Sequence, residues 1–451
     1  FFKKFMTTNS LKKQNAHKLE NVVIIGNGGR ENSLAWVIQK NKLIKNIYLI
    51  PGNGGSKHIN KCQNLEINYS DFESLKNRLN ELNVDLVVIG PETPLADGLG
   101  DKLRLSNFDV FGPNTNGAIL ESSKSWAKDF MKEANIPTAD FWVIDSIEKA
   151  EEIIKSSSNP LVVKADGLAS GKGVVIPENK EETINATKDA LQGKFGEAGK
   201  TVVLEEKIEG PEVSIFALCD GKKYVLLPTA QDHKRLEEND KGLNTGGMGA
   251  YSPTPLIKSK EMEVISQRII QPTIDELNKR NIDYRGVLYF GLMLTKDGPK
   301  VIEYNCRFGD PECQTIMPLM DENFINILKE CAIGNLSNTD SINPSNKVSG
   351  CVIATSEGYP SHYKVGYPIH IEKLENKNIQ IFHSGTKNNE QGRLITNGGR
   401  VLSIVCHGNN FDDVFEEIYE TLNKIKFKGI FYRKDIGNQV RDNFINKGES
   451  K

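Results

Sequence analysis

The sequence predicts a multidomain protein with an α/β N-terminal part, an α+β middle part and a small β-rich C-terminal part. At ~150 residues per domain, a chain of 451 residues suggests about three domains. Continuous apolar strands alternate with helices over the first 121 residues, and short strands in pairs separated by turn signals follow from Leu161. The composition, 38% hydrophobic and 26% charged, is typical of a globular protein.

Residues 21–121 predict a doubly wound domain with a parallel sheet. The apolar strands are NVVIIG, NIYLIP, VDLVVIG and FDVFGP, and a glycine turn leads from the first strand into a helix with apolar positions at Leu34, Ala35, Val37 and Ile38. Strands that are apolar throughout are typical of parallel sheets, because helices cover both of their faces. Residues 1–20, FFKKFMTTNSLKKQNAHKLE, read as an N-terminal extension, with an organellar transit segment as the alternative.

Residues 122–345 predict an α+β domain. A helix is expected over 122–134 and another over 181–191, and PLVVKA, GVVIP and TVVLEEKI read as short strands. Two hairpins follow, with turns predicted at Asp220-Gly221 and Asp297-Gly298. Residues 346–440 predict a third, small unit with strands and a helix over 411–425, and 441–451 form a polar tail.

Bulk charge and cysteine usage limit the possible partners. The formal net charge of −2 gives no reason to expect nucleic acid or an anionic membrane as a partner. No apolar run reaches the ~20 residues of a membrane span, so we expect a cytoplasmic protein. The seven cysteines form no CxxC pair and no zinc spacing, which favours free thiols in a reducing compartment.

The segment 162–176, VVKADGLASGKGVVI, is a glycine-rich loop between two apolar runs. It is not a Walker loop, because the glycine spacing is one residue short and Gly173 stands where that motif needs serine or threonine. A loop between two strands can still bind phosphate through its backbone amides, with Lys164 and Lys172 adding positive charge. The alternative is a flexible hairpin with solvated lysines.

Acidic side chains follow two of the predicted strands. Glu205, Glu206 and Glu212 follow one strand, and Glu303 and Asn305 end another. Residues i and i+2 of a strand share a face, so Glu303 and Asn305 point the same way and can share a hard cation such as Mg²⁺. The alternative is a solvated sheet face.

Together these segments resemble a known family. KADGLASGKG, EEKIEGPE and EYNCRFGDPE resemble the ATP-grasp fold, and GNGGRE, PGNGG, GPETPLADG, DHKR and NTGGMGAYSP narrow the match to the glycinamide ribonucleotide synthetases, also called phosphoribosylamine–glycine ligases. The resemblance extends from about residue 21 to about residue 432 and implies a pre-ATP-grasp domain, an ATP-grasp domain with a mobile lid over about 142–208, and a C-terminal domain. It implies ligation of glycine to 5-phosphoribosylamine in de novo purine biosynthesis, through a glycyl phosphate, with ADP and phosphate released and Mg²⁺ or Mn²⁺ required.

The resemblance also implies roles for individual residues. Those expected to bind ATP are Lys124, Lys164, Gly167, Ser170, Gly171, Lys172, Gly173, Glu205, Glu206, Ile208 and Glu212. Those expected to bind the other substrates are Gly28, Gly29, Arg30, Glu31, Gly52, Asn53, Gly54, Asn244, Gly246, Gly247, Met248 and Arg307. Catalytic roles fall to Lys172, Arg307 and Asp232, and metal binding to Glu303 and Asn305. His233 reads as structural, and Asn32 and Cys313 depart from the family pattern, where histidine and threonine are usual.

Three other interpretations remain at this point. The first is another ATP-grasp ligase or carboxylase of purine metabolism, which would share the middle domain. The second is a nicotinamide-linked oxidoreductase, although the GxGG spacing and the lack of an acid after Ile50 disfavour it. The third is a non-catalytic nucleotide-binding regulator. The sequence indicates neither the oligomeric state nor whether the chain is one module of a multifunctional enzyme.

Overall fold

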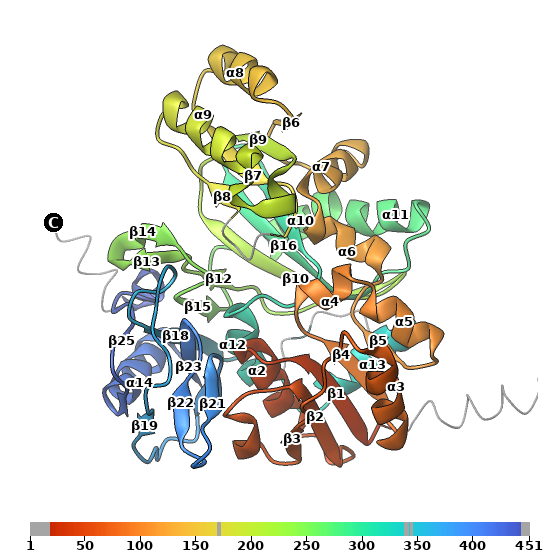
Figure 1. Cartoon of the computed structure of the whole chain (residues 1–451), viewed down its shortest axis with the longest axis vertical. Coiled ribbons are helices and arrows are strands. Elements are labelled where there is room, and N and C mark those ends of the chain that lie inside the picture. Colours follow the sequence, from red (N-terminus) through yellow and green to blue (C-terminus); the bar gives the residue numbers. More distant parts are fainter. Residues whose placement is uncertain (1–18, 169–172, 338–341, 343–345, 443–451) are drawn as a thin grey trace, which may run out of the picture.

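The computed structural model describes residues 19–168, 173–337, 342 and 346–442. Figure 1 shows three parts: an N-terminal sheet at the lower right, a central sheet with a small upper layer, and a C-terminal sheet at the lower left. This arrangement confirms the predicted multidomain fold class, with a parallel sheet first and mixed or antiparallel sheets after it.

The N-terminal part is a five-stranded parallel sheet with the order β3-β2-β1-β4-β5. Side chains alternate between its two faces: Val22 and Ile24 of β1 belong to one hydrophobic cluster, and Val23 and Ile25 belong to another. Both faces are therefore covered, as the unbroken apolar strands predict. The elements are β1 (Asn21–Gly26), α2 (Gly29–Ile38), β2 (Asn46–Pro51), β3 (Cys62–Asn64), α3 (Phe72–Glu81), β4 (Leu86–Ile89), α4 (Glu92–Ala96), α5 (Leu99–Leu105), β5 (Val110–Phe111) and α6 (Thr115–Ser122).

The middle part contains two four-stranded sheets, with the orders β11-β10-β16-β17 and β6-β9-β7-β8. The second sheet and its helices α8 and α9 have a hydrophobic cluster of their own, and we call them the lid layer. In Figure 1 the lid layer lies at the top, above the central sheet. The elements are α7 (Lys124–Glu133), β6 (Phe141–Ile144), α8 (Ile147–Ser156), β7 (Leu161–Ala165), β8 (Val174–Val175), α9 (Lys180–Asp189), β9 (Val202–Glu206), β10 (Glu212–Asp220), β11 (Tyr224–Leu226), α10 (Ser259–Ile265), α11 (Gln271–Lys279), β16 (Arg285–Thr295), β17 (Gly298–Asn305), α12 (Glu312–Ile316) and α13 (Phe324–Ile333).

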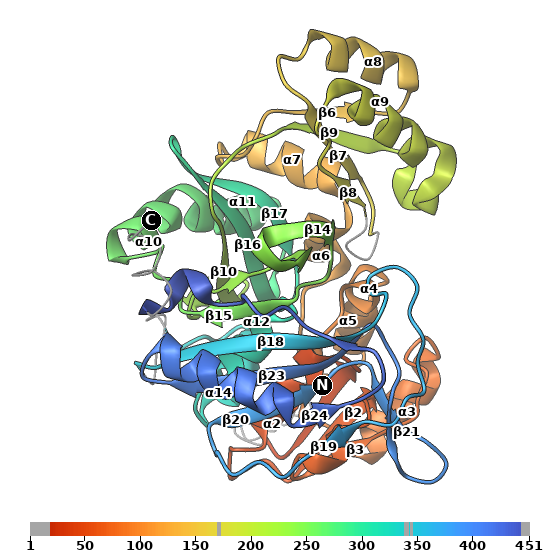
Figure 2. The ribbon, with the colours of Figure 1, turned by 90° about the vertical axis from the view of Figure 1, so that its left-hand side faces the viewer.

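The C-terminal sheet is completed by strands from the middle of the chain. Its order is β12-β15-β18-β23-β20, and β25 pairs with β18 beyond this path. Helix α14 packs on one face (Figure 2). Trp36 of α2 packs on the other face. The elements are β12 (Gln231–Asp232), β13 (Arg235–Glu237), β14 (Lys241–Asn244), β15 (Gly249–Ser252), β18 (Val348–Ser356), β19 (His370–Ile371), β20 (Ile379–His383), β21 (Thr386–Asn388), β22 (Leu394–Thr396), β23 (Arg400–Gly408), α14 (Phe411–Asn423), β24 (Ile425–Lys426) and β25 (Ile430–Phe431).

Each of the two predicted hairpin turns is displaced by one residue. In the first, the amide of Asp220 donates to the carbonyl of Lys223, so Gly221 and Lys222 are the central residues. Thr295 pairs with Gly298, so Lys296 and Asp297 are the central residues of the second hairpin's turn. Gly298 follows the turn with φ +109°, a value that glycine tolerates without strain. The loop over 162–176 joins antiparallel strands, because Val163 of β7 pairs with Val175 of β8, and this confirms the strand–loop–strand prediction.

The pairing of β15 with β18 predicts that residues 346–442 do not fold well alone. Without β15 the edge of β18 is unpaired, and Met248 and Tyr251 are missing from the core beneath α14. An unpaired apolar edge strand promotes association. We expect poorly dispersed amide NMR signals and aggregation for the isolated fragment. A monomeric fragment with a well-dispersed spectrum would contradict this prediction.

Candidate active site

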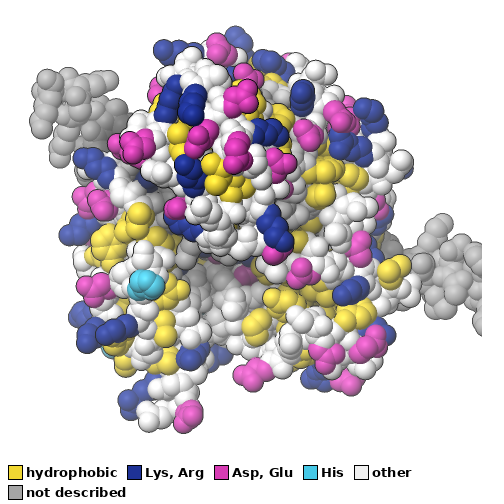
Figure 3. Space-filling view, turned by 45° about the horizontal axis from the view of Figure 1, so that its top comes forward, with side chains coloured by type: hydrophobic (Ala, Val, Ile, Leu, Met, Phe, Trp, Pro, Cys, Tyr) yellow, Lys and Arg dark blue, Asp and Glu magenta, His cyan; other side chains and the backbone are white. Residues whose placement is uncertain are grey.

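Two cavities meet between the three parts of the fold. One, of 760 Å³, lies between the lid layer and the central sheet, and we call it the lid cavity. The other, of 980 Å³, lies between the N-terminal and C-terminal parts, and we call it the N/C cavity. Figure 3 shows the surface hollowed between the upper layer and the two lower parts. The cavities share the lining residues Asn244, Thr245, Gly246 and Asp310, so they lie next to each other.

The lid cavity gathers five of the eleven residues predicted to bind ATP. Lys164 reaches it from β7, and Glu205, Glu206, Ile208 and Glu212 follow from β9 onward. Lys124, at the start of α7, instead donates to the carbonyl of Gly167 at 3.2 Å, and neither residue lines the cavity. Gly173 does not line it either. Ser170, Gly171 and Lys172 lie outside the described residues.

A buried carboxylate joins the lid layer to α7. Glu205 Oε1 lies 2.8 Å from Lys164 Nζ, and its Oε2 lies 2.9 Å from Lys128 Nζ. Burial alone would raise the pKa of Glu205, but the two ammonium groups outweigh it and lower that pKa below its usual value. Burial lowers the pKa of Lys128 to about 8. The carboxylate thus compensates two buried cations at the base of the lid layer.

The predicted metal ligands lie together on β17. Glu303 and Asn305 both line the lid cavity, as their shared strand face requires. Lys234 Nζ lies 3.5 Å from Glu303 and 3.1 Å from Glu212. One carboxylate and one amide oxygen beside an open cavity fit a hard divalent cation whose other ligands are phosphates and water. The sequence analysis did not predict a role for Lys234, although this residue lies in the DHKR motif.

A second group of carboxyls lies deeper in the same cavity. Burial, together with Glu312, Glu212 and Glu303, raises the pKa of Asp232 to about 8, while Lys234 opposes that shift. Glu312 accepts a hydrogen bond from the Tyr289 hydroxyl at 3.0 Å and is itself buried. Asp232 thus lies in the cavity as predicted from the sequence, beside acids that disfavour its charged form.

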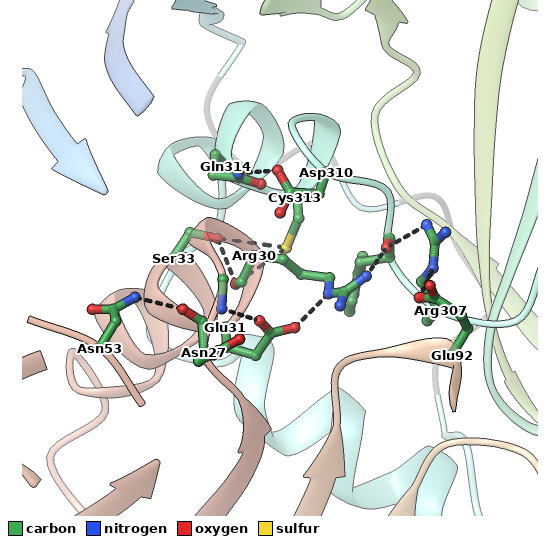
Figure 4. Close-up of polar contacts among 12 residues, drawn as sticks. Asn27, Arg30, Glu31, Ser33, Asn53, Glu92, Arg307, Asp310, Cys313 and Gln314 are labelled. Atoms are coloured by element: carbon green, nitrogen blue, oxygen red, sulfur yellow. Dashed lines mark hydrogen bonds and ion pairs between the residues drawn. The ribbon is translucent and has the colours of Figure 1, made fainter. Parts of the chain in front are cut away.

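Arg307 connects the end of β17 to the N-terminal part. Its guanidinium lies 2.8 Å from Glu121 and 3.2 Å from Glu92, and it also lines the lid cavity. In Figure 4, Arg307 and Arg30 approach the same backbone carbonyl, that of Phe308, from opposite sides. The loop after β17 is therefore fixed to the N-terminal sheet by two arginines.

The first βα turn has its polar groups already paired. Arg30 forms an ion pair with Glu31, and the amide of Gly28 donates to Glu31 at 2.7 Å. A Cβ atom on Gly29 would lie 2.5 Å from the amide nitrogen of Gln314, so there is no room for a ligand there. Gly28 lines the N/C cavity, whereas Gly29, Arg30 and Glu31 line neither cavity.

The two departures from the family pattern have structural contacts. Asn32 Oδ1 accepts from the backbone amide of His383 at 3.0 Å, which joins α2 to the C-terminal part. Cys313 is fully buried, and its sulfur lies 3.5 Å from the hydroxyl of Ser33. Both residues lie in the packing between α2 and its neighbours. Neither of them lines the lid cavity or the N/C cavity.

Some of the remaining residues predicted to bind substrate line the N/C cavity, and others pack behind it. Gly52, Asn53, Gly54, Asn244 and Gly246 line the N/C cavity. Gly247 packs against Pro311 with φ +110°, and Met248 is fully buried in the C-terminal core, so these two shape the turn rather than line a cavity.

Residues 433–439 contact the strand pair β13–β14, which begins at Arg235, the last residue of the DHKR motif. The fully buried side chain of Arg433 donates to Asp240 at 2.8 Å and to the carbonyl of Arg235 at 3.0 Å. Asp435 accepts from Arg433 and from the amide of Asn239. Gln439 lies 3.2 Å from Nε2 of His233 and lines the lid cavity. His233 is buried and also lines the lid cavity, so the structural role expected of it stays a prediction.

Comparison with known proteins agrees with this arrangement. Three consecutive segments match the domain families of phosphoribosylglycinamide synthetase: the N domain over residues 20–121, the ATP-grasp (A) domain over 122–313 and the C domain over 349–439. The chain belongs to the phosphoribosylglycinamide synthetase family. The resemblance inferred from the motifs is thereby confirmed. In the part of the chain that the structure describes, we find no helix long and apolar enough to cross a membrane.

Relatives of this family occur alone and within longer proteins. The chain is 43% identical to a phosphoribosylamine–glycine ligase of Nostoc sp., covering 93% of this chain and 99% of the relative. It is also 43% identical to a trifunctional purine biosynthetic protein of Chironomus tentans, covering 93% of this chain but only 31% of that protein. It spans 53% of a bifunctional purine biosynthetic protein of Schizosaccharomyces pombe.

Solved structures show the same fold. The crystal structure of phosphoribosylamine–glycine ligase from Thermotoga maritima matches with a TM-score of 0.82 and 34% identity, covering 92% of this chain and 99% of that one. A biotin carboxylase from Campylobacter jejuni matches with a TM-score of 0.71 at 15% identity, covering 96% and 98% of the two chains. The second likeness supports the fold alone.

The buried position of Glu205 predicts a large effect of removing its charge. Replacing Glu205 with Gln leaves the ammonium groups of Lys128 and Lys164 buried without a counter-ion. We expect a loss of about 3–5 kcal/mol in the free energy of unfolding, measured by urea denaturation. Glu206→Gln, on the exposed neighbour, is the matched control and should change stability by less than about 0.5 kcal/mol. Equal effects of the two variants would contradict the charge argument.

The contacts of Asp435 predict a pH-dependent contribution to stability. Burial would raise its pKa, but the hydrogen bonds from Arg433 and Asn239 lower it below the ordinary value of about 3.9. The contribution is therefore present above pH ~4 and is lost as the pH falls through the folded-state pKa. We expect Asp435→Asn to cost about 2 kcal/mol at pH 7 and much less at pH 3. A stability difference between variant and wild type that is the same at both pH values would contradict this prediction.

Proposed function

We propose that this chain ligates glycine to 5-phosphoribosylamine, with cleavage of ATP to ADP and phosphate. The observation that carries the proposal is the junction of the two cavities at residues 244–246 and Asp310. A carboxylate activated in the lid cavity can meet an amine held in the N/C cavity without leaving the protein. The family membership and the name of the Nostoc relative support the same reaction.

The reaction requires two transfers. A carboxylate oxygen of glycine attacks the γ-phosphorus of ATP, the bond to the β-phosphate oxygen breaks, and ADP leaves. The amine of phosphoribosylamine then attacks the carbonyl carbon of the glycyl phosphate, inorganic phosphate leaves, and the amine nitrogen loses a proton. No enzyme nucleophile takes part, so catalysis rests on positioning and on compensation of charge.

The residues of the lid cavity would divide these tasks. Lys164 would contact the ATP phosphates, Glu212 would accept hydrogen bonds from the ribose hydroxyls, and the lid layer would exclude water from the acyl phosphate. Lys124, Gly167 and Gly173 would join them only if the lid layer moves toward the cavity. Arg307 would bind a carboxylate or phosphate oxygen. Asp232, whose pKa of about 8 lies near neutrality, would accept the amine proton in its ionised form.

Glu303 and Asn305 would hold a divalent cation whose other ligands are phosphate oxygens of ATP and water. A bound Mg²⁺ or Mn²⁺ would neutralise the phosphate oxygens of ATP. Lys234 lies between Glu212 and Glu303 and supplies positive charge at the same carboxylates. The choice between the two metals and the cytoplasmic location stay predictions.

One specific contact disfavours the oxidoreductase interpretation. A dinucleotide-binding turn offers its helix-start amides to a pyrophosphate. Here Glu31 already accepts from the amide of Gly28, and Gly29 is covered by Gln314. The Gly28 amide of this turn is therefore not available to a pyrophosphate, and we favour the ligase over the oxidoreductase.

Isotope transfer tests the proposed acyl phosphate. Glycine labelled with ¹⁸O in its carboxylate is incubated with ATP, Mg²⁺ and phosphoribosylamine generated in situ, and the inorganic phosphate is analysed by mass spectrometry. We expect one labelled oxygen in each phosphate released, and ADP formation only when all three substrates are present. Unlabelled phosphate, or ADP formation driven by bicarbonate in place of glycine, would overturn the proposal.

A further inference from the structure

The N/C cavity has two chemically distinct ends. At one end the Gly246 carbonyl and Asp310 contact Arg400, beside the lid cavity. At the other end the loop 52–55 packs on β21: the amide of Gly54 donates to the Thr386 carbonyl at 3.1 Å, and a Cβ atom on Gly54 would lie 3.0 Å from the Cα atom of Lys387. The lining of this cavity therefore runs from the junction to β21.

The backbone amides of loop 52–55 are not available to an anion. Gly52 donates to the Gly26 carbonyl and Gly54 to Thr386, while the amide of Asn53 donates to the Ser56 hydroxyl and that of Gly55 to the Asn53 side chain. The glycines of this loop allow close approach to β21 rather than forming an open cradle. A phosphate group in the cavity must therefore find its positive partner in a side chain.

Among the lysine and arginine side chains of the lining, one is a candidate for that partner. Arg400 lies 3.2 Å from the Asp310 carboxylate and also donates to two backbone carbonyls. Lys387 is exposed to the cavity, and among the described residues it has neither an ion pair nor a hydrogen bond from Nζ. Glu66 is the other charged group of the lining without an ion pair in the described chain, and a carboxylate suits ribose hydroxyls.

We propose that Lys387 binds the 5-phosphate of phosphoribosylamine, which orients the substrate with its phosphate at β21 and its amine at the junction with the lid cavity. This inference rests on the proposed function. The end of the cavity with an unpaired cation takes the dianion, and the end whose cation is already neutralised takes the amine. The C-terminal part thus supplies the positive charge that binds the phosphate, which the N-terminal glycine loop lacks. The amine then faces the site where the acyl phosphate forms.

Calorimetric titration of the full chain with the proposed product tests the placement. The ligands are glycinamide ribonucleotide and glycinamide riboside, which lacks the phosphate. Lys387→Gln should weaken binding of the ribonucleotide by about 10- to 100-fold, the effect of losing a hydrogen bond between charged groups, and leave binding of the riboside unchanged. Lys377→Gln, on an exposed lysine that lines neither cavity, is the matched control and should bind both ligands as wild type does.

Kinetics give a second measurement. Lys387→Gln should raise the KM for phosphoribosylamine by a similar factor while kcat changes little, because the phosphate is remote from the reacting amine. Equal binding of the ribonucleotide by variant and wild type, or equal losses for ribonucleotide and riboside, would overturn the placement alone. A wild-type chain that neither binds the ribonucleotide nor forms ADP from the three substrates would instead overturn the proposed function, and this inference with it.

Discussion

The position of the site depends on one clamp of charges, the contact of Arg307 with Glu92 and Glu121. Arg307 follows β17 by two residues, so the clamp fixes the strand end that carries Glu303 and Asn305 to the N-terminal sheet. The three groups are largely buried, and removing one partner of such a set leaves an uncompensated charge that costs several kcal/mol. The lid cavity, the N/C cavity and their junction are all bounded by the loop that this clamp holds.

Two lysines of the lid cavity, Lys164 and Lys234, already have carboxylate partners before any nucleotide enters. Lys164 contacts Glu205, and Lys234 contacts Glu212 and Glu303. These internal counter-ions keep the cations ordered and prevent the energetic cost of isolated buried charge. A triphosphate with its metal ion would replace these carboxylates as the partners of the lysines. Because the lysines are already paired, the site would not attract every anion strongly.

Much of the fold followed from local patterns in the sequence, and the site followed only in part. Unbroken apolar strands predicted the parallel sheet, and spacing on one strand predicted that Glu303 and Asn305 share a cavity. The pairing of β15 with β18 joins segments about a hundred residues apart in sequence, and no periodicity indicates it. Arg30 and Gly29 read as substrate contacts, but their environment is set by Glu31, Gln314 and Phe308, which only the three-dimensional packing brings to them. Lys234 and Lys387 were missed, because a single lysine in the sequence does not indicate which groups lie around it in the fold.

Because β12 and β15 complete a sheet whose remaining strands come from the end of the chain, the middle and C-terminal parts are interleaved rather than joined end to end. A recombination event that exchanged residues 346–442 between two distant homologues would have to preserve every side-chain fit across β15 and β18 at once. The three parts are therefore expected to be inherited as a block. That agrees with the bifunctional and trifunctional relatives, which each match over 92–93% of this chain and so contain the ligase as an undivided unit.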